Sequence, residues 1–271
     1  MSTPLAPARP TRISLAVRDS STMLRRNLLH ARRYPSLTLN LLLTPIMLLL
    51  LFVYIFGDTM SAGIGGGADR SEYIAYLVPG LLLMTIGSTT IGTAVSVSND
   101  MTEGIIARFR TMAIHRPSVL VGHVVGSVLQ SIMSVVLVGA VAAAIGFRST
   151  DATALEWLAA FALVTLFALA LTWIAVGMGL ISPNAEAAGN NAMPLIFLPL
   201  ISSTFVPVDA MPGWFQPVAE YQPFTPAVET LRGLLLGTEI GHNGWLAIAW
   251  CLGLVVLGCF WSTSTFNRDP K

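Results

Sequence analysis

The chain has 271 residues, of which 54% are hydrophobic and 11% are charged, and its formal net charge is +1. Soluble domains usually carry about 25% charged residues, and disordered chains combine low hydrophobicity with high charge, so the composition excludes both classes. It predicts an all-α integral membrane protein, because helices satisfy their own backbone hydrogen bonds in lipid. The alternating pattern of outer-membrane strands is absent from the sequence.

Residues 1–36 predict a cytoplasmic segment that contains an amphipathic helix over residues 13–33. Ile13, Val17, Leu24 and Leu28 share one face at 100° per residue, and most of the arginines lie off that face. Such a helix suits the membrane interface. It can serve as a membrane anchor, as a docking surface for a cytoplasmic partner, or as both.

Six apolar stretches predict transmembrane helices, because crossing a bilayer takes roughly 20 apolar residues. They are Leu37–Phe56, Tyr73–Val97, Val119–Phe147, Trp157–Ile181, Ala192–Val208 and Trp245–Thr265. The fifth is short and contains Pro194, Pro199 and Pro207. Together they define a membrane domain over residues 37–266, followed by a cytoplasmic tail of residues 267–271.

The basic residues orient these spans, because cytoplasmic loops carry the excess of arginine and lysine. If the N-terminus is cytoplasmic, 12 of the 15 basic residues lie on the cytoplasmic side, and an even number of spans returns the C-terminus there. These are Arg9, Arg12, Arg18, Arg25, Arg26, Arg32, Arg33, Arg108, Arg110, Arg116, Arg268 and Lys271.

The segment between the second and third spans, Ser98–Ser118, has an amphipathic core. An apolar stripe is formed by Met101, Ile105, Phe109 and Met112, and Glu103 points away from it. This pattern predicts a short helix at the inner membrane face that can receive a push from a soluble partner. The alternative is an ordinary positively charged cytoplasmic loop.

Residues 209–237, after the fifth span, are too polar and proline-rich to cross the membrane and too apolar for a solvated loop. Thr225 can cap a helix with Pro226 at its first position, and Gly237 suits a left-handed stop. We therefore predict a helix over residues 226–236 that dips back into the outer leaflet. Glu220, Glu229 and Arg232 should then be paired or in contact with water, because bare charges are costly in lipid.

The sequence lacks the motifs of catalysis and nucleotide binding. It has no phosphate-binding loop, since its single lysine is Lys271, and it contains no HExxH or GxSxG motif. The four histidines are scattered, so we predict no metal site and no bound cofactor. All fourteen acidic residues lie outside the predicted spans, which disfavours an ion-driven transporter. An energy-supplying partner is therefore expected.

Two segments carry a resemblance to a known family. EGIIARFRTMAIHRPSVLVG (103–122) and PLIFLPLISSTFVPVDAMPGWFQPVAEYQPFTPAVETLRG (194–233) are similar to signatures of ABC-2 type transporter permease subunits, close to daunorubicin-resistance-type drug exporters. The resemblance covers about residues 24–266. The chain departs from the family pattern at Ala113, where proline is frequent, and at His123, where a basic residue is frequent.

The resemblance implies a half-transporter. Two permeases, as a homodimer or a heterodimer, would pair in the membrane, and two ABC ATPase subunits would bind ATP and Mg. It implies ATPase coupling through Asp100, Glu103, Gly104, Arg108, Phe109, Arg110 and Glu186. It implies a substrate pathway along Met84, Ser88, Thr89, Phe197, Ser202, Thr204 and Phe205, residues that helix packing also explains. A re-entrant gate would contain Pro212, Trp214, Glu220, Glu229 and Arg232.

The expected function is therefore export of a hydrophobic or amphipathic substrate, a drug or a lipid-like molecule, across the bacterial cytoplasmic membrane, with both termini cytoplasmic. The permease would catalyse no reaction itself and would bind no nucleic acid. Three alternatives stay open: export of a lipid or glycan precursor, an ATP-independent channel or secondary transporter, and a scaffold without transport.

Overall fold

The computed structural model describes residues 35–55, 70–102, 116–149 and 152–267, and these are helical, with no strand among them. The helices are α2 (Pro35–Tyr54), α4 (Arg70–Thr102), α6 (Arg116–Ile145), α7 (Ala154–Ile181), α8 (Ala185–Ala192), α9 (Pro194–Leu200), η1 (Val208–Ala210), α10 (Gln216–Tyr221), α11 (Phe224–Leu236) and α12 (Asn243–Asn267). The predicted all-helical class is confirmed for this part of the chain. The amphipathic helix predicted over residues 13–33 lies outside the described residues.

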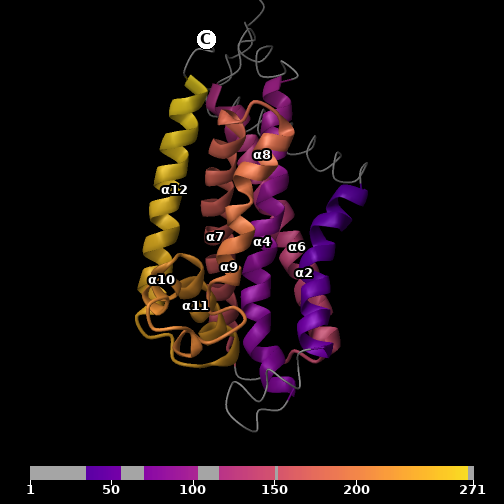
Figure 1. Cartoon of the computed structure of the whole chain (residues 1–271), viewed down its shortest axis with the longest axis vertical. Helices are drawn as coiled ribbons and strands as arrows, with labels where there is room; N and C mark the ends of the chain where they lie inside the picture. The colour runs from indigo at the N-terminus through magenta and orange to yellow at the C-terminus, as the bar shows by residue number, and fades with distance from the viewer. Residues whose placement is uncertain (1–34, 56–69, 103–115, 150–151, 268–271) are drawn as a thin grey trace, which may run out of the picture.

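Helix α4 is the centre of the bundle. It packs against α2, α6, α7, α8, α9 and α11, and α12 packs mainly on α7. Figure 1 shows the long helices side by side, with α2 on one flank and α12 on the other. Helices α10 and α11 gather at one end, which we call the α11 end. The opposite end, towards which α8 lies, is the α8 end.

Local sequence signals set several helix boundaries. The backbone N–H of Thr153 donates to the Glu156 carboxylate over 2.6 Å, and Thr153 Oγ1 accepts from the Glu156 N–H, so the two residues form a capping box at the start of α7. Gly237 ends α11 with φ of 67°, as predicted. The predicted cap at Thr225 is wrong, because α11 already begins at Phe224.

The predicted fifth span is helical over fewer residues than expected. Helix α9 ends at Leu200, and residues 201–206 form turns and a bend. Two features explain the early end: Pro199 has no N–H to donate, and Ser202 Oγ bonds the Pro199 carbonyl over 2.7 Å. Because α8 ends only two residues before α9 begins, the two helices form one nearly continuous rod.

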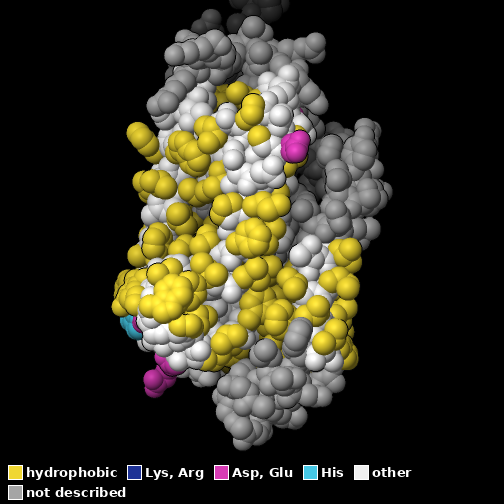
Figure 2. Space-filling view, in the orientation of Figure 1, with side chains coloured by type: hydrophobic (Ala, Val, Ile, Leu, Met, Phe, Trp, Pro, Cys, Tyr) yellow, Lys and Arg dark blue, Asp and Glu magenta, His cyan; other side chains and the backbone are white. Residues whose placement is uncertain are grey.

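The described helices have the lengths and compositions of membrane spans. Four are long and apolar enough to cross a membrane, over residues 71–102, 120–145, 154–181 and 243–267, and α2 adds a shorter apolar stretch over residues 43–54. Large hydrophobic side chains on α6 and α12 face outward, among them Val136, Leu257 and Phe260. Figure 2 shows hydrophobic side chains over the middle of one face, with the visible charged side chains towards its ends. A bilayer is the solvent that suits this surface.

Candidate functional site

A column of buried hydroxyl groups runs along the middle of α4. Thr85, Ser88, Thr89, Thr90 and Thr93 are all buried. Most of these hydroxyl groups donate to carbonyls of α4 itself, and two of the five contact hydroxyl groups of α6. Thr89 Oγ1 lies 2.7 Å from Ser131 Oγ, and Thr93 Oγ1 donates to Ser127 Oγ over 2.8 Å. These bonds satisfy groups that would be costly to leave unpaired in an apolar interior.

Six of the seven predicted pathway residues are buried inside this single chain. Met84, Ser88 and Thr89 lie on α4, and Ser202, Thr204 and Phe205 lie in the turns after α9. The seventh, Phe197, is 56% exposed on α9 and points away from the others. Ser202 Oγ lies 2.7 Å from Thr204 Oγ1, and the Phe205 ring centroid lies 4.5 Å from that of Phe52. Their role as a pathway stays a prediction.

At the α11 end, Arg232 joins three segments of the chain. Its guanidinium is buried and donates to the carbonyl of Tyr76 on α4 over 3.1 and 3.2 Å. It also donates to the carbonyl of Ser203, in the turns after α9, over 2.9 Å. The guanidinium carbon lies 3.8 Å from the centroid of the Tyr76 ring, a cation–π geometry.

Side chains around Arg232 complete this contact, which we call the Arg232 junction (Arg232, Glu229, Tyr76 and Ser203). Arg232 pairs with the partly exposed carboxylate of Glu229 on the preceding turn. The Tyr76 hydroxyl donates to the Ser203 carbonyl over 2.8 Å. Glu220, Glu229 and Arg232 were predicted to be paired or in contact with water, and for Glu229 and Arg232 the structure shows the pair. The junction fixes the turns after α9 against α4 and α11, and so satisfies non-helical backbone inside the protein.

The other predicted gate residues lie nearer the surface. Pro212 and Trp214 are exposed, Trp214 by 80%, and Glu220 on α10 is half-buried. The rings of Trp214 and Phe215 meet edge to face, with centroids 5.4 Å apart. The indole N–H of Trp250 on α12 donates to the Tyr221 carbonyl over 2.9 Å, which ties α10 to the bundle. Their role in gating stays a prediction.

At the α8 end, Asp100 and His123 form a buried contact between α4 and α6. His123 Nε2 lies 2.9 Å from Asp100 Oδ2, and the contact is an ion pair when the imidazole is protonated. Asp100 was predicted to lie in a loop outside the spans, but α4 continues through Thr102 and buries it in its last turn. The expectation that all acidic residues lie outside the long apolar helices is therefore wrong at this position.

Only part of the predicted coupling surface falls on described residues. Glu186 is exposed in the first turn of α8, whose N-cap is Asn184. Residues 182–191 lie between the predicted fourth and fifth spans, yet most of them are helical, and the Asn184 carboxamide caps this helix by accepting the Ala187 N–H over 2.8 Å. Glu103, Gly104, Arg108, Phe109 and Arg110 lie outside the described residues.

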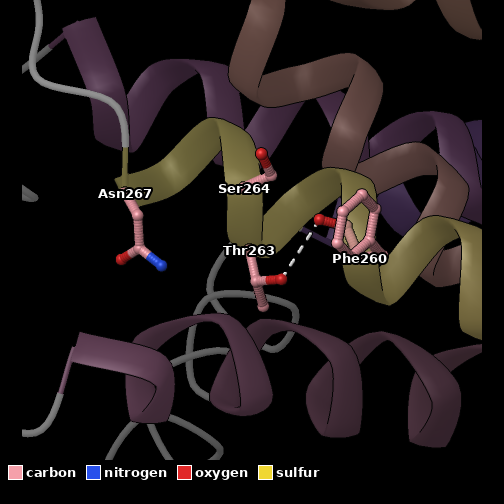
Figure 3. A pocket seen from close by; sticks show the side chains of 4 residues that line it. All are labelled: Phe260, Thr263, Ser264 and Asn267. Atoms are coloured by element: carbon pink, nitrogen blue, oxygen red, sulfur yellow. Dashed lines mark hydrogen bonds between the residues drawn. The ribbon is translucent and has the colours of Figure 1, made fainter.

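The described residues offer little for a metal or a cofactor. No group of three histidine, cysteine or acidic side chains gathers within the part of the chain that the structure describes. An open hollow on α12 is lined by Phe260, Thr263, Ser264 and Asn267 (Figure 3). It has no charged lining, and the Thr263 hydroxyl is used within α12, where it donates to the Phe260 carbonyl. We assign no ligand to it.

Sequence reasoning missed the partners of the two polar contacts. His123 was treated as a scattered histidine, although an imidazole in an apolar stretch is a usable signal, since burial requires a partner. Tyr76 and Ser203 act mainly through backbone carbonyls, which any residue carries. No sequence pattern marks such acceptors, so only the fold reveals the Arg232 junction.

Comparisons with known proteins agree with this architecture. The profile of the ABC-2 type transporter family matches residues 19–236. The chain is 28% identical, over 256 residues, to the daunorubicin resistance ABC transporter permease protein DrrB1 of Streptomyces coeruleorubidus, covering 93% of this chain and 85% of that protein. It is thus similar to a permease of a drug-resistance ABC transporter along nearly its whole length.

Two further relatives are more distant. The chain is 24% identical over 190 residues to the probable doxorubicin resistance ABC transporter permease protein DrrC of Mycobacterium tuberculosis, covering 65% of this chain and 64% of that protein. It is 26% identical over 238 residues to nodulation protein J of Rhizobium meliloti, covering 80% of this chain and 82% of that protein. With the family profile matching most of its length, this chain belongs to the ABC-2 type transporter family.

Proposed function

We propose that this chain is the membrane subunit of an ATP-driven exporter that moves a hydrophobic or amphipathic molecule out of the cytoplasm. The observation that carries the proposal is the family match over residues 19–236, joined to the apolar helices that the same residues form. The sequence has no phosphate-binding loop. ATP and Mg would therefore be bound by a separate ABC ATPase.

The proposed assembly contains two permeases and two ATPase subunits. Each permease would cross the membrane six times with both termini in the cytoplasm, so that the α8 end faces the ATPase. The α8–α9 rod would supply the fifth span together with the turns that follow it. The distribution of arginine along the sequence supports this orientation.

In the proposed cycle, ATP binding closes the ATPase dimer and moves the cytoplasmic coupling surface. Residues 103–110 and Glu186 would receive this movement, and α4 and the α8–α9 rod would pass it to the α11 end. Such coupling requires that ATP bind more tightly to one of two permease conformations than to the other. The α11 segment, with Arg232 and Glu229, would then act as the outer gate.

The substrate is proposed to be a drug or a lipid-like molecule. The names of two relatives link them to daunorubicin resistance and doxorubicin resistance. Between Glu72 and Asp100 the sequence of α4 has no charged residue, so this helix offers no charge that would select an ionic solute. Export of a lipid or glycan precursor is the alternative within the same family.

Reconstitution tests the proposal directly. Proteoliposomes that contain the permease and its ABC ATPase should accumulate daunorubicin or a fluorescent phosphatidylcholine analogue when Mg and ATP are supplied to the ATPase side. Permease alone should accumulate neither probe. Because Asp100 and His123 are titratable and buried, the matched arm is permease alone with an imposed proton gradient. Uphill accumulation in that arm would replace the proposal with a secondary transporter.

The coupling surface is tested by charge reversal. In the assembled complex, Glu103→Lys should keep expression and basal ATP hydrolysis and remove the stimulation of hydrolysis by substrate. Glu239→Lys, an exposed position between α11 and α12 and outside the proposed gate residues, is the matched control and should leave stimulation in place. Unchanged transport by the Glu103→Lys variant would remove residues 103–110 from the coupling surface.

The pathway is tested with two aromatic residues that differ in burial. Phe205 is 7% exposed and Phe197 is 56% exposed. If the pathway follows the residues proposed above, Phe205→Leu should change the ranking of substrates more than it changes basal ATP turnover. Equal rankings for wild type, Phe205→Leu and Phe197→Leu would contradict the proposed pathway.

A further inference from the structure

We infer that Asp100 and His123 form a clasp that holds the α8 end of α4 to α6, so that these two helix ends move as one unit during transport. The inference rests on the proposed function, in which an ATPase presses on the segment that connects α4 to α6. It gives Asp100 a role different from direct contact with the ATPase. Both residues become positioning residues that act through the helices on which they stand.

The geometry identifies the clasp as a contact inside the protein. His123 Nε2 and Asp100 Oδ2 are 2.9 Å apart, and their side chains are only 4% and 12% exposed. A surface of the ATPase could not reach these atoms without displacing helices. The pair joins the last turn of α4 to the second turn of α6, the two helices that flank residues 103–115. A push on that segment therefore arrives at both sides of the clasp.

The local physics disfavours an acidic residue at this place. Asp100 lies in the last turn of α4, where the helix dipole is negative, and that turn has no basic residue of its own. Burial adds to the cost of the carboxylate charge. The compensation comes from a different helix, through His123. A residue that is unfavourable in its own helix and is stabilised by a residue of another helix is expected at functional sites.

Apolar packing surrounds the clasp and makes it a firm contact. A hydrophobic cluster at this end joins four helices through Val97, Leu120, Val124, Trp173, Val176, Leu180 and Phe266. Opposite charges attract more strongly in such a medium than in water. The neighbouring contact between the same two helices, Thr93 to Ser127, is a hydrogen bond between neutral hydroxyls. The Thr93–Ser127 pair therefore serves as a control, because it is a contact that only holds α4 against α6.

The test measures a movement that needs no knowledge of the substrate. Cys251 and Cys259 are replaced by alanine, and spin labels are attached at Glu72→Cys and Trp245→Cys, two exposed positions at the start of α4 and near the start of α12. The complex with the ABC ATPase is assembled in nanodiscs. Label distances are then recorded without nucleotide and after trapping with Mg, ATP and vanadate.

We expect trapping to shift the label distance in the wild-type background. Asp100→Asn and His123→Gln should each lower the fraction of shifted complexes at least about 5-fold, the lower end of ordinary coupling factors. The control variant Thr93→Val/Ser127→Ala should keep the full shift. The exchange variant Asp100→His/His123→Asp should recover most of it, because it restores the same pair across the same two helices.

Several outcomes would overturn the clasp. A full distance shift in both single variants would overturn it. The clasp would also be overturned if the Thr93→Val/Ser127→Ala control lost as much of the shift as the single variants, because the Asp100–His123 pair would then only hold the helices together. If the single variants are not expressed as folded protein, the exchange variant decides the question. A full distance shift in the exchange variant supports the clasp, whereas failure of the exchange variant to be expressed or to show the shift overturns it. An unshifted wild-type complex would instead contradict the proposed coupling to an ATPase, which keeps the two failures distinct.

Discussion

The two ends of α4 are held by polar contacts of different kinds. At the α11 end, Arg232 donates to the main-chain carbonyls of Tyr76 and Ser203 as well as to the Glu229 carboxylate. At the α8 end, the contact between Asp100 and His123 involves only side chains. Carbonyl positions are fixed by the fold, so the first contact depends on the planar fork of donors that arginine presents. The second depends on the two side chains alone, so the exchange variant Asp100→His/His123→Asp can test it.

This difference separates a structural role from a role in coupling. The α11 end has further ties, because Ser149 Oγ donates to the Leu235 carbonyl over 2.6 Å and the rings of Phe167 and Phe224 meet edge to face. Nearly all of α11 is buried. We therefore expect substitutions in the Arg232 junction to lower stability, and substitutions in the clasp to lower coupling more than stability.

The largest effect is expected for Arg232→Ala. The change removes the guanidinium donors from the Tyr76 and Ser203 carbonyls, although Ser203 keeps the Tyr76 hydroxyl, and it leaves Glu229 without its partner. Arg232 bonds two main-chain carbonyls, and hydrogen bonds to a charged group contribute about 1.5–3 kcal/mol each, so the loss should be about 3–6 kcal/mol. The free energy of unfolding in detergent should fall by that amount, which can be measured by chemical denaturation followed by tryptophan fluorescence.

Two variants sharpen this comparison. Arg232→Lys keeps the charge but cannot bond both carbonyls at once, so it should recover less than half of the loss. Glu229→Gln leaves the carbonyl bonds intact, and because the Glu229 side chain is 31% exposed, its loss should stay below about 1 kcal/mol. If Arg232→Lys were as stable as wild type, charge alone would explain the junction.

A smaller effect is expected for Gly179→Ala on α7, where α7 approaches α4. A Cβ atom at Gly179 would lie 2.5 Å from the Ala94 carbonyl oxygen, and a backbone atom cannot move aside as a side chain can. Overpacking of this kind costs about 1–3 kcal/mol. The control is Gly139→Ala on α6, where the nearest atom, Leu82 Cδ2, lies at 3.8 Å. Thermal unfolding should separate the two variants, and equal midpoints would show that α7 and α4 can move apart freely.

Long helices could be predicted from the sequence, because an apolar run long enough to span lipid has few other solutions. The second, third, fourth and sixth predicted spans coincide with α4, α6, α7 and α12 to within a few residues at most ends. The stop of α11 at Gly237 was also predictable, since glycine favours a left-handed cap. The pairing of Glu229 with Arg232 followed from the cost of bare charge in lipid.

Features that depend on tertiary contacts could not be predicted. The turns after α9 require Arg232 and Thr225 to satisfy the backbone of Ser203, and both lie far along the chain. Burial of Asp100 requires His123 from the next helix, whereas the polar sequence around Asp100 favoured a loop. Whether the predicted pathway residues contact a substrate depends on an assembly that a single chain does not contain.

The smallest effect is expected for the hydroxyl pair in the middle of α4. Thr89 Oγ1 lies 2.7 Å from Ser131 Oγ, yet Thr89 also bonds the Ile86 carbonyl of its own helix, so the Thr89 hydroxyl keeps a partner when Ser131 is replaced. A double-mutant cycle with Thr89→Val and Ser131→Ala should therefore give a coupling energy of about 0.6 kcal/mol, the average for such bonds within membranes. A value above about 2 kcal/mol would exceed that range and would mean that the hydroxyl column is itself a firm contact between α4 and α6.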